Sequence, residues 1–197
     1  MSAAAQASDA FRGSRDDETL VRECLNGNGQ AWSALIDKYK NLIFSIPIKY
    51  GFSPEDANEI FQSTCLTLLN ELSQVREPRA LAAWLIRATA HKCKRYRRDQ
   101  RKYIDSPIDE NLSDETEKLP EKLWQELERE QILREVVDEQ SPECRQLIDL
   151  LFFANPPLRY DEAAQALQMA KGSIGATRMR CLEKLRRALE KKGFADY

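Results

Sequence analysis

Apolar residues recur three and four positions apart along most of the chain, and no stretch alternates as a strand does. This spacing predicts helices over residues 18–26, 30–50, 54–72, 81–102, 120–139, 142–152, 160–167 and 172–192. Two starts are marked by the same signal, Ser53-Pro54-Glu55-Asp56 and Ser141-Pro142-Glu143. Each places a capping serine before a proline and acids that favour the positive helix end. The pattern therefore predicts an all-α protein.

Two stretches with few apolar anchors divide the chain. Residues 1–16 read as a disordered tail, and residues 103–119 combine Pro107 with many acids, which is typical of a flexible linker. We therefore expect two small helical domains, at 17–102 and 120–192, joined by a flexible acidic linker.

The helix predicted at 81–102 changes character along its length. It begins with Leu81, Trp84, Leu85 and Ala88 at helical spacing, and ends with a run of cations from Arg87 to Lys102. Such a helix suits a polyanion, because phosphates attract clustered cations whatever the base sequence. A solvated basic helix end, favoured by its own dipole, is the alternative interpretation.

A second basic stretch covers residues 171–192, so the net charge of −2 hides a strong segregation of charge. Just before it, Ala163, Ala164 and Leu167, followed by Ile174, form the pattern of a helix-turn-helix. In that motif the first turns of the second helix enter the major groove of DNA. Other helical hairpins share this pattern, so the motif alone is a moderate signal.

Several chemistries have no support in the residues. The sequence has one histidine, no glycine-rich phosphate loop and no metal-ligand spacing, so we expect no enzyme activity, cofactor or metal. No apolar run is long enough to insert into a membrane. Five separated cysteines argue against a disulfide framework and for a reducing, cytoplasmic location.

Three stretches, in this order, resemble the bacterial sigma-70 family, in its extracytoplasmic-function (ECF) type. DANEIFQSTCLTLL at 56–69 is similar to the family's D-A-x-D-[LI]-x-Q-x-x-F-L-x-L-L core. REPRALAAWLIRATAH at 76–91 is similar to its R-x-P-x-x-L-x-x-W-L element, and KGSIGATRMRCLEKLRRAL at 171–189 to its recognition helix. The chain departs from the family at Cys65, His91 and Gln168. It also has Gly175-Ala176 for a frequent Lys-Ser pair, which bears on the −35 sequence that is read.

The resemblance implies a sigma region 2-like bundle at 17–102 and a sigma region 4-like helix-turn-helix domain at 120–192. It implies a sigma factor that binds core RNA polymerase and directs promoter recognition and transcription initiation. Its DNA partners would be the duplex −35 element and the melted −10 strand, and an anti-sigma factor is a further partner found for many relatives.

The resemblance also implies three sets of site residues. Those for polymerase binding are Asp56, Glu59, Ile60, Gln62 and Ser63. Those for the −10 element are Arg76, Arg79, Ala80, Trp84, Arg87, His91, Lys94, Arg95 and Arg98. Those for the −35 element are Lys171, Ser173, Gly175, Thr177, Arg178 and Arg180.

The residues by themselves leave alternatives open. The acidic side of helix 54–72 has the composition of an ordinary solvated face, Trp84 has the spacing of a core residue, and Ser173 can equally cap its helix. For the whole chain, the alternatives are a helix-turn-helix regulator that binds DNA without polymerase and a protein-binding helical adaptor. An enzyme is the least supported, and the adaptor leaves both basic helices unexplained.

Overall fold

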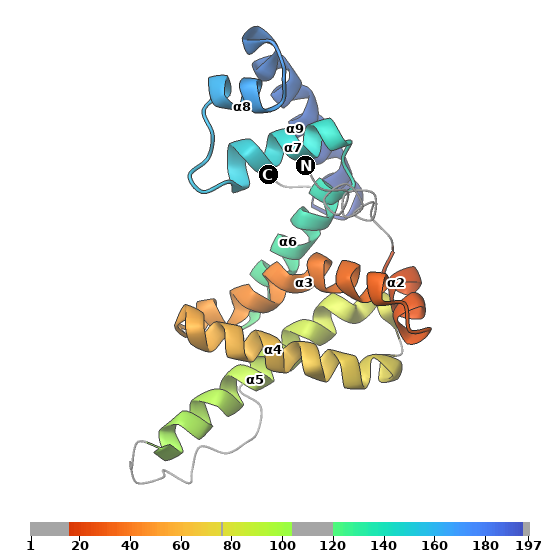
Figure 1. Cartoon of the computed structure of the whole chain (residues 1–197), viewed down its shortest axis with the longest axis vertical. Helices are drawn as coiled ribbons and strands as arrows, with labels where there is room; N and C mark the ends of the chain where they lie inside the picture. Colours follow the sequence, from red (N-terminus) through yellow and green to blue (C-terminus); the bar gives the residue numbers. More distant parts are fainter. Residues whose placement is uncertain (1–15, 76, 104–119, 195–197) are drawn as a thin grey trace. The chain divides into compact units, whose positions relative to one another are not determined.

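Helices form every regular element in the part of the chain that the computed structural model describes, residues 16–75, 77–103 and 120–194 (Figure 1). The all-α fold expected from the periodicity is confirmed. The described residues divide into two compact units, one up to Gln131 and the other from Ile132 onward. Apart from Asp16 and Tyr103, the expected tail and linker lie outside the described residues.

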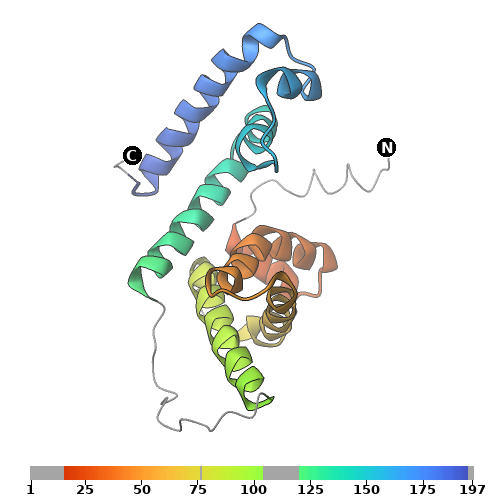
Figure 2. The ribbon, with the colours of Figure 1, turned by 90° about the vertical axis from the view of Figure 1, so that its left-hand side faces the viewer.

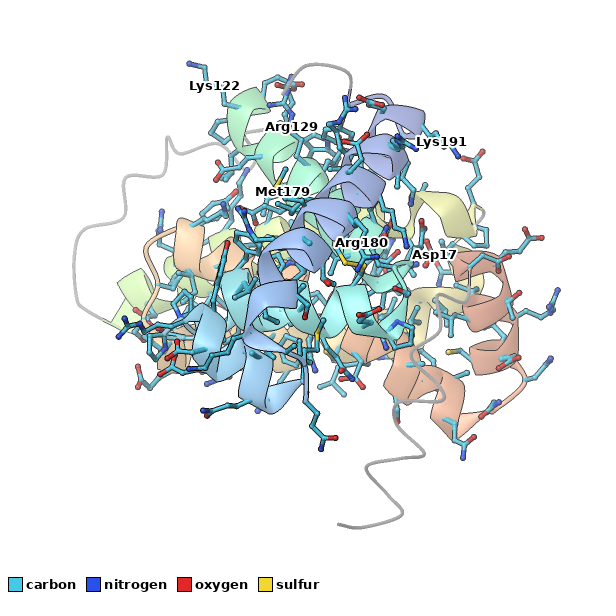
Figure 3. All side chains as sticks on the ribbon, turned by 90° about the horizontal axis from the view of Figure 1, so that it is seen from above. Asp17, Lys122, Arg129, Met179, Arg180 and Lys191 are labelled. Atoms are coloured by element: carbon cyan, nitrogen blue, oxygen red, sulfur yellow. A yellow bond between two sulfur atoms is a disulfide. The ribbon has the colours of Figure 1, made fainter. Side chains whose placement is uncertain are left out.

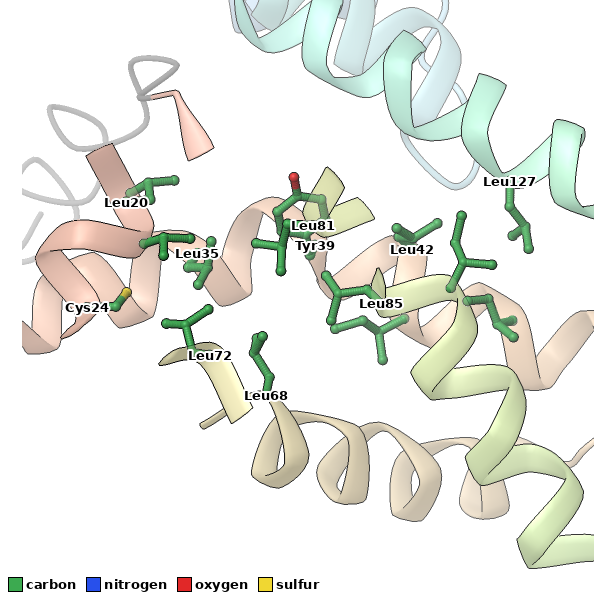
Figure 4. Close-up of a cluster of buried hydrophobic side chains, with 14 of the residues drawn as sticks. Leu20, Cys24, Leu35, Tyr39, Leu42, Leu68, Leu72, Leu81, Leu85 and Leu127 are labelled. Atoms are coloured by element: carbon green, nitrogen blue, oxygen red, sulfur yellow. The ribbon is translucent and has the colours of Figure 1, made fainter. Parts of the chain in front are cut away.

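The first unit packs α2 (Asp17–Leu25), α3 (Gly29–Lys49), α4 (Pro54–Glu71) and α5 (Leu81–Tyr103). Short 3₁₀ turns, η1 (Leu72–Gln74) and η2 (Pro78–Ala80), lie where a loop was expected. The start signal at Ser53 acts as predicted, because its Oγ accepts a hydrogen bond from the Asp56 backbone N–H at 3.1 Å. Figure 4 shows the buried core of this unit, which includes Leu35, Tyr39, Leu68 and Leu85.

The helix α6 (Glu121–Asp138) spans the division between the units, so only its first half belongs to the first one. Leu127, in that half, is fully buried in the core of the first unit, near Leu42 and Leu85 (Figure 4). An ion pair of 2.8 Å joins the Lys49 ammonium to Glu130. The sequence had placed this whole helix in the second domain.

The second unit contains α7 (Pro142–Ile148), η3 (Asp149–Phe153, a π turn), α8 (Tyr160–Ala166), η4 (Lys171–Ser173) and α9 (Ile174–Lys191). The long helix α9 is seen side on in Figure 2. Ala163, Ala164 and Ile174 are buried where α8 and α9 pack together, which confirms the predicted helix-turn-helix. In the turn, Gln168 adopts a left-handed φ of 53° at a position where glycine is common in the resembled family.

A disulfide joins Cys144 of α7 to Cys181 of α9, with 5.4 Å between the Cα atoms. For this pair the expectation against disulfides was wrong. The two cysteines are 37 residues apart in the sequence, and only the packing of α7 on α9 brings them together. Cys24, Cys65 and Cys93 are free thiols.

Candidate functional site

The outer face of α4 carries most of the residues expected to bind polymerase. Glu59 and Gln62 are exposed, while Asp56 and Ser63 are half-buried. Ile60 is different: only 1% of its surface is exposed. It belongs to the inward stripe of α4 with Ala57, Thr64 and Leu68, so it does not share the exposed face of the other candidates.

Two leucines that were not assigned to the site extend the outer face of α4. Leu66 is 61% exposed and Leu69 is 55% exposed. The signal was present in the sequence, because the adjacent residues Leu68 and Leu69 point about 100° apart on a helix. Only one of them can face the core. The outer face therefore combines carboxylates at its start with apolar side chains at its end.

A hydrogen-bond network ties the acidic start of α4 to the basic helix α5. The Tyr96 hydroxyl donates to Asp56 Oδ1 at 2.7 Å, and Gln100 Nε2 donates to the same oxygen at 3.3 Å. The bond from Tyr96, followed by that from Ser53, lowers the pKa of the Asp56 carboxyl below its ordinary value. The same bond to Asp56 raises the pKa of Tyr96 to about 12.

Most of the α5 residues expected at the −10 element lie along one side of the helix. Arg87, His91, Arg95 and Arg98 are exposed at three- and four-residue spacing, and Lys94 is half-buried. Arg95 Nε lies 3.7 Å from Asp99 Oδ2. The described part of α5 thus presents a basic stripe.

The remaining −10 candidates are less exposed or not described. Trp84 is half-buried and packs against the core of the first unit, as its spacing indicates. Ala80 is half-buried in η2. Arg76 and the side chain of Arg79 lie outside the described part of the structure. The Arg87 guanidinium lies over the Trp124 ring of α6, 5.9 Å from its centre.

The −35 candidates around the start of α9 are not equivalent. Lys171 and Arg180 are exposed, and Ser173, Gly175 and Arg178 are half-buried. Thr177 is only 3% exposed and lies on the inward side of α9, apart from the exposed candidates. Its hydroxyl accepts a hydrogen bond of 3.1 Å from Arg180 Nη2.

The described residues contain neither a metal-binding cluster nor a membrane-spanning helix. They contain no cluster of three or more histidine, cysteine or acidic side chains that is arranged to hold a metal ion. Nor do they contain a helix with the length and apolar composition needed to span a membrane.

Residues 35–103 match the family model of sigma-70 region 2. This match covers 69 of the 197 residues, and that segment is similar to region 2 of the sigma-70 family. This region 2 domain holds both the outer face of α4 and the basic stripe of α5, and it supports a sigma-factor role in transcription initiation. Among the curated proteins, no sequence matches the chain.

One similar solved structure is described as CnrH in complex with the cytosolic domain of CnrY. Its sequence is 20% identical, and the match covers 90% of this chain and 99% of that one. The TM-score of this match is 0.39.

Proposed function

We propose that this protein is an ECF-type sigma factor, which binds core RNA polymerase and directs it to promoters through −10 and −35 contacts. One observation carries the proposal: the residues that match region 2 form, in one packed unit, an acidic outer face on α4 and a basic stripe on α5. Faces of opposite charge on neighbouring helices suit two different partners, a protein and a nucleic acid.

In this proposal the polymerase binds the outer face of α4, through Asp56, Glu59, Gln62 and Ser63. Leu66 and Leu69 support this assignment, because exposed leucines on one helix side favour burial against another protein. The carboxylates steer and orient the encounter, while burial of the leucines supplies affinity.

The basic stripe of α5 binds the −10 region in this proposal. Arg87, His91, Lys94, Arg95 and Arg98 hold phosphates or base edges of the melted strand. The family resemblance also implies that the stretch 75–80, which includes the candidates Arg76, Arg79 and Ala80, forms a pocket for a flipped base. Extruding a base costs a few kcal/mol, so a fitted pocket both selects it and helps to open the duplex.

The second unit supplies the −35 contacts in this proposal. The helix-turn-helix of α8 and α9 makes it the counterpart of region 4, and the start of α9 enters the major groove. Lys171, Ser173, Gly175, Arg178 and Arg180 remain its candidate contacts, while the burial of Thr177 removes that residue. An anti-sigma factor stays a prediction of the family resemblance.

Transcription reconstituted from purified core polymerase tests the proposed function. Core enzyme alone and core enzyme with this protein are incubated with a pool of promoter fragments. Promoter-dependent transcripts are expected only in the second reaction. If the isolated protein instead binds a specific duplex while core polymerase neither binds it nor responds to it, the protein is an independent helix-turn-helix regulator.

A charge reversal tests the polymerase-binding face within the same assay. Glu59→Lys places a cation among the outer carboxylates of α4, whereas Glu71→Lys places one at the far, exposed end of the same helix. Glu59→Lys is expected to weaken core binding at least tenfold, because like charges at an interface cost several kcal/mol. Equal affinities for the two variants contradict the assigned face.

A further inference from the structure

The first turns of α9 have a clear inward side and a clear outward side. Ile174, Thr177, Cys181 and Leu185 are buried and form the inward side. The exposed positions among the preceding turn and first helical turns are Lys171, Gly172, Ala176, Met179 and Arg180. The outward side is the one available to a DNA groove.

Three residues expected to contact the −35 element are engaged within the protein. The Ser173 hydroxyl donates to the Ala170 carbonyl at 2.7 Å, and Thr177 is buried. The Arg178 guanidinium lies over the Phe152 ring, 5.5 Å from its centre. Reading of base edges therefore falls to the side chains on the outward side, while Ser173 and Arg178 remain candidates for contacts with the DNA backbone.

Met179 is the most exposed large hydrophobic side chain of the described residues, with 63% of its surface accessible. It lies next to Arg180 on α9, and both are labelled in Figure 3. It was not among the residues assigned from the sequence. An apolar side chain this open contributes little to the core of its own unit, so it is accessible to another molecule.

Several residues that precede Met179 in η4 and α9 have a small side chain or none. A Cβ atom added at Gly172 or Gly175 would meet no atom within 4 Å, and Ala176 carries only a methyl group. Bulky side chains therefore do not hold this part of α9 away from a groove floor. Met179 is long enough to reach a base edge that the helix approaches closely.

We propose that Met179 reads the C5-methyl group of a thymine in the −35 element, an assignment that rests on the proposed function. In the major groove, thymine presents a methyl group where the other bases present donors or acceptors. The Met179 thioether has no hydrogen-bond donor, so it discriminates by apolar contact. Arg180, beside it, supplies the hydrogen bonds or charge that hold the same stretch of DNA.

The test uses holoenzyme formed from core polymerase and the full chain. The −35 sequence is first selected from a randomised library, and each thymine in it is then replaced by deoxyuridine, which lacks only the methyl group. At one position, wild-type holoenzyme is expected to bind the deoxyuridine duplex about fourfold more weakly than the thymine duplex. This ratio corresponds to the free energy of burying one methyl group. Met179→Gln, similar in length and in helix propensity, is expected to bind both duplexes equally.

Arg187→Gln is the matched control, since Arg187 is exposed on the same helix but lies two turns farther on. Holoenzyme with Arg187→Gln is expected to keep the full difference in affinity between the thymine duplex and the deoxyuridine duplex. Because Met179 is exposed, its replacement leaves the core intact, which a far-ultraviolet circular dichroism spectrum checks.

The assignment of Met179 is overturned if the selected element contains no thymine, if no deoxyuridine weakens binding, or if Met179→Gln retains the sensitivity. In each case wild-type holoenzyme still transcribes, so the proposed function stands. If wild-type protein gives no promoter-dependent transcript with core polymerase, the proposed function fails and the assignment fails with it.

Discussion

At the residue scale, a single hydroxyl links the acidic and basic helices of the region 2 domain. Tyr96 of α5 donates to Asp56 of α4 and also lies 3.1 Å from Glu59 Oε2. Two of the four outward polymerase-binding candidates are thus positioned by a residue of α5, the candidate DNA-binding helix. The sequence predicted the acids and the tyrosine on separate helices, but helical spacing alone does not show which residues meet across them.

Replacing Tyr96 by phenylalanine tests this link. The substitution removes the largest influence that lowers the pKa of Asp56, so this pKa is expected to rise toward its ordinary value of 3.8. Titration of the Asp56 carboxyl by NMR measures the change. Tyr160→Phe, an exposed tyrosine in the other unit, is expected to leave the Asp56 titration unchanged. The same Asp56 pKa in wild type and Tyr96→Phe contradicts the assigned bond.

The pKa shifts of Asp56 and Tyr96 make the stability of the fold depend on pH in opposite directions. A carboxyl whose folded pKa is lowered stabilises the fold above its ordinary pKa, and this contribution is lost as pH falls through the folded value. A phenol whose folded pKa is raised stabilises the fold below its ordinary value of 10, and the contribution is lost as pH rises through about 12. The Asp56–Tyr96 bond is therefore complete at neutral pH.

At the element scale, α6 shows what the periodicity of a helix leaves undetermined. Leu127 and Val136 are both fully buried apolar residues of α6, but Leu127 packs into the first unit and Val136 into the second. Periodicity identifies the side of a helix that is buried, not the elements that bury it. That choice depends on tertiary contacts, here between Leu127 and the α3–α5 core and between Lys49 and Glu130.

Truncation of Leu127 measures how much α6 contributes to the first unit. Leu127→Ala is expected to lower the free energy of unfolding of that unit by about 2–5 kcal/mol, as for other fully buried leucines. Leu66→Ala, at an exposed leucine of α4, is expected to change it by less than about 0.5 kcal/mol. Urea denaturation of both variants provides the comparison, and equal stabilities would show that α6 is not part of this core.

The disulfide between α7 and α9 is the second feature that helical periodicity could not reveal. It closes a loop of 37 residues that includes α8, the turn and the first turns of α9, and a loop of this length gives a stabilisation of about 4 kcal/mol in the chain-entropy model. Reduction by dithiothreitol is therefore expected to lower the stability of the second unit by roughly this amount.

Thermal unfolding with and without reductant checks this expectation. Cys144→Ala should abolish the response to reductant, whereas Cys65→Ser, at a free and half-buried thiol, should keep it. A Cys144→Ala variant that still responds to dithiothreitol would rule out the bond as the source of the effect.

At the scale of the whole molecule, the sequence was most informative where local pattern determines structure. The helices, the capped starts and the helix-turn-helix follow from the spacing of apolar, capping and small residues, and they are confirmed. Ile60 and Thr177 were included among the contact candidates although both are buried, because a family motif describes which residues recur, not which of them face the core. Met179 was missed because an exposed apolar residue is recognised only once the core is known.

The segregation of charge has a consequence for the complete promoter complex. The chain has a net charge of −2, yet its candidate DNA-binding helices are basic, so binding to DNA depends on local rather than overall charge. Each phosphate contact on a single strand adds about 0.7 to the slope of log affinity against log salt. Arg95→Gln is therefore expected to lower the slope for holoenzyme on a melted −10 strand by about 0.7.

Arg22→Gln is the matched control, because Arg22 is an exposed arginine of α2, outside the basic stripe of α5. The slope of log affinity against log salt for Arg22→Gln holoenzyme is expected to equal that of the wild type. A cation that touches no phosphate releases no counterion. Fluorescence anisotropy of a labelled −10 strand, measured over a series of salt concentrations, gives all three slopes. Identical slopes for Arg95→Gln and wild type would remove the basic stripe of α5 from the −10 contact and leave its charge as ordinary solvated surface.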